Sequence, residues 1–99
     1  MLVNLFIKQE CREEYLRALH EVLPAARREP ACLFLYANEA VDEPGRIVLF
    51  EHWRDQDEYV NEILARDYFK RYLAASENVY AAPRVVVQLD PIDPTSHVA

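Results

Sequence analysis

The stretch from Arg46 to Trp53 constrains the fold more than any other part of the chain. It is rich in β-branched and aromatic residues and follows Glu43-Pro44-Gly45, which is typical of a turn. We therefore expect a central strand over 47–53. Alternate residues of a strand point to opposite faces, so Ile47, Leu49, Glu51 and Trp53 would share one face and Val48, Phe50 and His52 the other. Both faces are mostly apolar, so both must be covered.

Length and composition narrow the class of protein. The 99 residues predict one domain, with 52% hydrophobic residues and a net charge of −6. This acidic balance argues against binding to nucleic acid or to an anionic membrane. Cys11 and Cys32 have no metal-binding spacing, and we expect two free thiols and a cytoplasmic protein. No apolar run approaches the ~20 residues of a membrane span.

The order of elements is β-α-β-β-α-β. Strands are predicted over 2–8, 32–38, 47–53 and 84–89, with a hairpin between the second and third and a loop over 78–83. A helix is predicted from Arg12 to Arg28, kinked or divided at Pro24. Asp55 is the predicted N-cap, with Glu58 completing a capping box, of a helix over 56–64; Arg66-Asp67 separates it from a helix over 68–76.

This order is the split βαβ, ferredoxin-like pattern of the α+β class, a four-stranded antiparallel sheet with both helices on one face. We expect one domain over 1–92 and a C-terminal tail over 93–99. We assign to the helix side the more aliphatic set Val3, Leu5, Ile7, Leu33, Leu35, Val48, Phe50, Val85, Val87 and Leu89. The opposite face then carries Asn4, Phe6, Phe34, Tyr36, Leu49, Glu51, Trp53, Val86 and Gln88. This face carries too many aromatic side chains to remain exposed to solvent. We therefore expect a second subunit to cover it, in a homodimer whose two sheets enclose a cavity in each protomer.

Several short motifs resemble a known family. Glu29-Pro30-Ala31-Cys32 resembles its Glu-Pro-Gly-Cys entry to the second strand, and Tyr36 stands at a recurrent aromatic position. Glu51-x-Trp53 followed by Asp57-Glu58-Tyr59 resembles its Glu-x-Trp motif and the next helix start, and Asp67-Tyr68-Phe69-Lys70 its following helical segment. Together they resemble the antibiotic biosynthesis monooxygenase (ABM) domain over about residues 1–92.

The resemblance implies a dimeric α+β barrel with a pocket between sheet and helices. It also implies, for some members, oxygenation of phenolic or quinol-like substrates without metal or flavin, because the substrate anion itself reduces dioxygen. Other members degrade haem or isomerise their substrates. This chain lacks the histidines that many members carry after Glu-x-Trp, and 63–76 offers no haem-ligating histidine.

The predicted catalytic residues are Glu51, Asn4 and Tyr36. A carboxylate in an apolar pocket has a raised pKa and can remove a proton from a phenol, but Glu51 can equally be a structural hydrogen-bonding group. Asn4 can polarise a substrate oxygen or bond at a strand end, and Tyr36 can donate to an oxyanion or pack under a partner subunit. The three dispersed histidines predict no metal site.

The predicted substrate-binding residues are Trp53, Phe34, Phe6, Leu49 and Tyr68. Trp53 can stack on an aromatic ring or anchor the core. The leading hypothesis is a cytoplasmic homodimeric monooxygenase that needs no cofactor and combines a small aromatic or quinol-type substrate with dioxygen. A non-catalytic dimer that binds a small molecule, and an isomerase that transfers a proton without oxygen, remain as alternatives.

Overall fold

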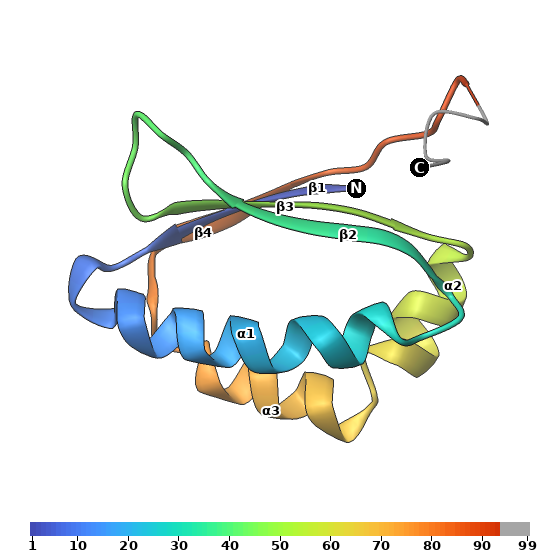
Figure 1. Cartoon of the computed structure of the whole chain (residues 1–99), viewed down its shortest axis with the longest axis horizontal. Coiled ribbons are helices and arrows are strands. Elements are labelled where there is room, and N and C mark those ends of the chain that lie inside the picture. The colour runs from blue at the N-terminus through green and yellow to red at the C-terminus, as the bar shows by residue number, and fades with distance from the viewer. Residues whose placement is uncertain (94–99) are drawn as a thin grey trace.

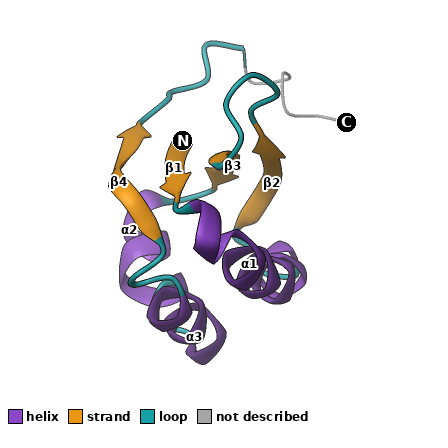
Figure 2. Cartoon of the chain, turned by 90° about the vertical axis from the view of Figure 1, so that its left-hand side faces the viewer, coloured by secondary structure: helices purple, strands orange, loops and turns teal. Residues whose placement is uncertain are grey.

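A four-stranded antiparallel sheet with helices on one side forms the protein in the computed structural model, which describes residues 1–93 (Figures 1 and 2). The strands are β1 (Leu2–Ile7), β2 (Cys32–Glu39), β3 (Arg46–Trp53) and β4 (Tyr80–Val87), in the spatial order β2-β3-β1-β4. The helices are η1 (Gln9–Cys11), α1 (Arg12–Arg27), α2 (Gln56–Glu58), η2 (Tyr59–Ile63) and α3 (Asp67–Ala75). This confirms the predicted ferredoxin-like α+β fold.

The helix boundaries largely follow the predicted signals. The Asp55 side chain accepts from the Glu58 backbone N–H at 3.1 Å, which confirms it as the N-cap. The Glu58 carboxylate binds Arg54, at 2.8 and 2.7 Å. The helical path is interrupted at Arg66, whose backbone is extended. α1 runs through Pro24 to Arg27, so the proline does not divide the helix.

β4 begins four residues earlier than predicted. Tyr80 already pairs with Ile7 and Ala82 with Phe6, so most of the expected loop over 78–83 is strand. The pairing with β1 contains register shifts, and Pro83 lies on this edge strand, where a missing N–H can face away from the ladder. The predicted loop over 78–83 ended at Pro83, a residue that an edge strand tolerates.

Cross-strand pairs show which residues face the helices, because directly paired residues point to the same face. Val3 pairs with Leu49, Leu5 with Ile47, and Leu35 with Glu51. All six are buried. The face predicted for β3 was therefore wrong: its helix side carries Ile47, Leu49, Glu51 and Trp53, whereas Phe50 lies on the exposed side.

The face predicted for β4 was wrong in the same way. Val86 pairs with the buried Val3, whereas Val85 pairs with Asn4 on the opposite face. Val85, Val87 and Leu89 are exposed. Leu33, also expected on the helix side, is exposed at a register shift between Cys32 and Phe34. The helix-side core comes mainly from β1, β3 and the inner faces of α1 and α3.

The sheet face opposite the helices is apolar and uncovered in the single chain, as Figure 2 shows for the backbone layers. Tyr36 is 53% exposed and Phe50 40%. Phe34 packs between them, with its ring centroid 5.4 Å from that of Tyr36 and 4.9 Å from that of Phe50. In the described part of the chain, every helix is too short or too polar to cross a membrane.

Candidate functional site

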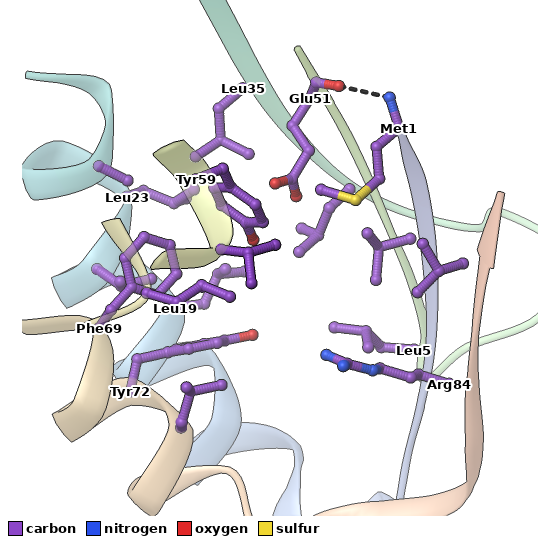
Figure 3. Close-up of a pocket in the computed structure, with 18 of the residues that line it drawn as sticks. Met1, Leu5, Leu19, Leu23, Leu35, Glu51, Tyr59, Phe69, Tyr72 and Arg84 are labelled. Atoms are coloured by element: carbon purple, nitrogen blue, oxygen red, sulfur yellow. Dashed lines mark hydrogen bonds between the residues drawn. The ribbon is translucent and has the colours of Figure 1, made fainter. Parts of the chain in front are cut away.

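A cavity of about 270 Å³ lies between the sheet and the helices (Figure 3). Its walls are mostly aliphatic and aromatic side chains from α1, β1, β3, α3 and β4. The lining side chains that can hydrogen-bond or carry charge are Glu51, Gln56, Tyr59, Tyr72, Tyr80, Arg84 and Gln88, and the Met1 ammonium donates to the Glu51 carbonyl at 2.7 Å. An apolar cavity with a few convergent polar groups is the usual form of a small-molecule site.

Glu51 is the buried acid of this cavity. It is 5% exposed, and its carboxylate points into the cavity toward the Tyr59 hydroxyl (Figure 3). The Trp53 indole N–H donates to Glu51 Oε1 at 2.8 Å, and Tyr59 donates a second hydrogen bond. Burial raises the pKa of Glu51, and these bonds and the Met1 ammonium only partly oppose that rise. The group is thus suited to accept a proton nearer neutral pH than an exposed glutamate.

A π-helical turn positions Tyr59 beside Glu51. In η2 the Leu64 N–H donates to the Tyr59 carbonyl at 3.0 Å, across five residues instead of four. Tyr59 packs on Trp53 with ring centroids 4.8 Å apart. Burial, and next the Glu51 charge, raise the pKa of Tyr59, so it stays a neutral hydroxyl that donates to the carboxylate.

A second polar group lies lower in the cavity. The Tyr72 and Tyr15 hydroxyl oxygens are 2.8 Å apart, and Tyr72 is also hydrogen-bonded to Tyr80. Burial raises the pKa of Tyr72, which keeps this hydroxyl protonated. Arg84 reaches into the same part of the cavity from β4 (Figure 3). The cavity therefore has a carboxylate at one end and a guanidinium at the other.

The structure brings together only some of the predicted site residues. Glu51 and Leu49 line the cavity, and Trp53 holds Glu51. Asn4 lies on the opposite sheet face, where its Oδ1 accepts from Arg46 Nε at 3.1 Å and from Nη2 at 2.8 Å.

The other predicted contacts also lie away from this cavity. Phe6, Phe34 and Tyr36 belong to the open sheet face with Asn4. Tyr68 donates to the Glu29 carboxylate at 2.7 Å, outside the cavity. The cavity of the single chain thus lies under the sheet, in the place that the family resemblance implies, and the inter-sheet cavity of a homodimer stays a prediction.

Residue patterns alone missed Tyr59, Tyr72 and Arg84 as site groups. Tyr72 lies in the helix predicted over 68–76, but nothing in that helix indicated a cavity beside it. A signal for Arg84 was present: once Val86 is placed opposite Val3, alternation along the strand puts Arg84 and Gln88 on the same face. Among residues 1–93, no three histidine, cysteine, aspartate or glutamate side chains are grouped as metal ligands would be.

Comparison with solved structures shows the same fold. A protein from Nitrosomonas europaea described as a candidate antibiotic biosynthesis monooxygenase superposes with a TM-score of 0.86 at 19% identity, over 94% of this chain and 88% of its own. A Bacteroides thetaiotaomicron protein with the same provisional description gives 0.84 at 26% identity, over 92% and 86%. A crystal structure of an antibiotic biosynthesis monooxygenase, whose description gives no organism, has a TM-score of 0.83 at 25% identity, over 92% and 95%.

No curated protein matches the chain. The family model "Antibiotic biosynthesis monooxygenase" (ABM) matches residues 1–75, three quarters of the 99 residues. The match spans β1 to α3 and so includes Glu51, Trp53, Tyr59 and Tyr72. The chain belongs to the antibiotic biosynthesis monooxygenase family.

Proposed function

We propose that the protein is a cofactor-independent monooxygenase acting on a small aromatic molecule with an ionisable hydroxyl, such as a phenol or quinol. The observation that carries this proposal is Glu51, a carboxylate of raised pKa in an apolar cavity. Membership of the ABM family supports the oxidative chemistry. The aliphatic walls suit a ring, and the buried acid is the one group placed to remove its hydroxyl proton.

The proposed reaction begins when Glu51 takes the hydroxyl proton of the bound substrate. Tyr59, which donates to Glu51 in the free protein, can turn its hydroxyl toward the new oxyanion. The electron-rich anion transfers an electron to dioxygen, and the two radicals combine with formation of a carbon–oxygen bond. Loss of water then leaves the oxidised ring. For a quinol the balance is quinol plus dioxygen to hydroxyquinone plus water, so no external reductant is required.

The direct test is oxygen consumption with menadiol or anthrone. We expect uptake above the buffer rate for the wild-type protein and a loss of about a hundredfold in Glu51→Gln, because general-base catalysis contributes roughly that much or more. Glu62→Gln is the matched control, since Glu62 is an exposed carboxylate on the same η2 turn. Uptake at the buffer rate, or an unchanged rate in Glu51→Gln, would refute the oxygenase proposal.

The Glu51–Tyr59 pair also supports a second candidate, an isomerase. A carboxylate and a neutral hydroxyl can remove and return a proton on one substrate without oxygen. Under anaerobic conditions, an isomerase would convert a keto–enol substrate into its isomer, whereas an enzyme limited to oxygenation would give no net product. Isomer formation that depends on Glu51 would favour the isomerase.

We further propose a homodimer formed through the open sheet face. Tyr36, Phe50, Val85 and Val87 are all exposed on that face, and a contiguous exposed apolar patch often marks an interaction surface. Phe50→Asp should shift sedimentation from dimer to monomer; a wild-type monomer at micromolar concentration would refute the dimer. The two free thiols, Cys11 and Cys32, support a cytoplasmic location, which fractionation of the source cells would test.

A further inference from the structure

Within residues 1–93, Arg84 is the only arginine that lines the cavity. Its guanidinium extends from β4 across the cavity mouth toward the Tyr72 hydroxyl (Figure 3). No carboxylate lies within 4 Å of it among the residues that the structure describes, whereas Arg12, Arg54 and Arg66 each hold a glutamate. Arg84 is exposed to solvent at the rim and unpaired with any described carboxylate, so its guanidinium is available to a ligand that enters the cavity.

The neighbouring hydroxyl strengthens this interpretation. Tyr72 is buried, and its hydroxyl is hydrogen-bonded to that of Tyr15 at 2.8 Å and to that of Tyr80. This network holds the phenol in place opposite Arg84. The planar guanidinium provides paired donors for one planar anion, and Tyr72 adds its single O–H when Tyr15 and Tyr80 donate to the Tyr72 oxygen.

The positions of the charged groups at the two ends of the cavity indicate how a ligand would be oriented. Glu51 and Tyr59 lie at the opposite end of the cavity, with Leu19 and Phe69 between the two ends (Figure 3). A ligand that fills the cavity therefore meets an acid at one end, apolar walls along its body and a cation at the other end. A neutral quinol would leave Arg84 without an anionic partner.

We propose that Arg84, assisted by Tyr72, binds a carboxylate of the ligand, and that the substrates are aromatic acids whose hydroxyl lies at the far end, toward Glu51. This deepens the proposed function and rests on it for the reacting hydroxyl. Arg84 thereby sets specificity and orientation. The guanidinium also compensates the charge of the ligand in a cavity that already contains a carboxylate.

The experiment is a binding titration of 6-hydroxy-2-naphthoate and of its neutral isostere 6-hydroxy-2-naphthamide, followed by naphthol fluorescence without oxygen. We expect the wild-type protein to bind the acid about tenfold more tightly than the amide, as one charge-assisted ion pair at a partly exposed site allows. Arg84→Gln should lose this preference while its affinity for the amide changes less than about twofold. Arg84→Lys should keep part of the preference, because it retains charge without the planar fork.

Arg71→Gln is the matched control, since Arg71 lies on α3 with its guanidinium near Glu21 rather than in the cavity. Circular dichroism and the urea midpoint establish that each variant is folded. Equal wild-type affinity for acid and amide, a preference that survives in Arg84→Gln, or no binding of either compound at about 1 mM would each overturn the proposal. Because no oxygen is present, failure of oxygenation leaves this measurement unaffected, so the two proposals fail separately.

Discussion

The hydrogen bond from Trp53 to Glu51 allows a quantitative test of the site's electrostatics. Trp53→Phe removes the indole N–H that donates to Oε1 at 2.8 Å and keeps an aromatic ring against Tyr59. A hydrogen bond to a buried charged acceptor contributes about 2 kcal/mol, and one between neutral groups about 1 kcal/mol. The variant also loses packing, so the single substitution does not isolate the bond.

A double-mutant cycle with Glu51→Gln isolates it. When Glu51→Gln is the background, the acceptor is neutral at every pH, so Trp53→Phe should cost about 1 kcal/mol less there than in the wild-type background when Glu51 is ionised. The packing loss is common to both backgrounds and cancels. Urea unfolding of the four proteins at about pH 9 gives the coupling energy.

The same cycle at about pH 4 provides the control. There Glu51 is protonated because burial raises its pKa, both acceptors are neutral, and the coupling energy should fall to near zero. A coupling energy that is equal at the two pH values, or absent at about pH 9, would show that the carboxylate does not depend on Trp53. The proposal that the Trp53 indole N–H stabilises the ionised form of Glu51 would then be refuted.

Three further predictions follow from other contacts. Because burial raises the pKa of Glu51, its proton is held more tightly in the folded state, so wild-type stability should fall as the pH rises from about 4.3 through the raised value. Glu51→Gln should gain stability relative to the wild type across that range, as measured by urea unfolding. Gly45→Ala should lower the free energy of unfolding by about 1–2 kcal/mol, because Gly45 has φ +91° and a Cβ would lie 3.0 Å from the Ile7 carbonyl oxygen; an unchanged urea midpoint would contradict this. Arg12→Gln should raise the pKa of Glu39, which Arg12 and then the Gly45 N–H hold at about 2, in an NMR titration, and a pKa that stays there would show that the backbone bond suffices.

The element order and the helix signals could be predicted from local patterns. The Asp55 cap and the break at Arg66 depend on neighbouring residues, so short windows of sequence contain the information. The faces of β3 could not be assigned this way. Both parities of this strand are mostly apolar, so alternation alone does not distinguish them.

The pairing register of β2 and β3 would have shown that Glu51 faces the helices. The hairpin places Glu39 opposite Ile47, which brings Leu35 opposite Glu51. Leu35 was already expected on the helix side, and paired residues share a face. In β4, Val85, Val86 and Val87 are identical, so alternation of residue types does not show which of them faces the helices. Their orientation depends on the pairing with β1, which contains register shifts. The cavity itself arises where the helices pack on the sheet, and contacts between such distant segments cannot be read from a short window of sequence.

Because η2 is a π-helical turn, the number of residues in it determines which side chain lies beside Glu51. The bond from Leu64 to the Tyr59 carbonyl encloses one residue more than an α-helical turn. Removing one residue between them would restore the α-helical pattern and rotate the preceding side chains by about 100° about the axis relative to α3. The phenol would then leave Glu51, and a neighbouring side chain would take its place. A one-residue deletion in this turn is therefore equivalent to a substitution at the Glu51 end of the cavity, although Tyr59 itself remains in the sequence.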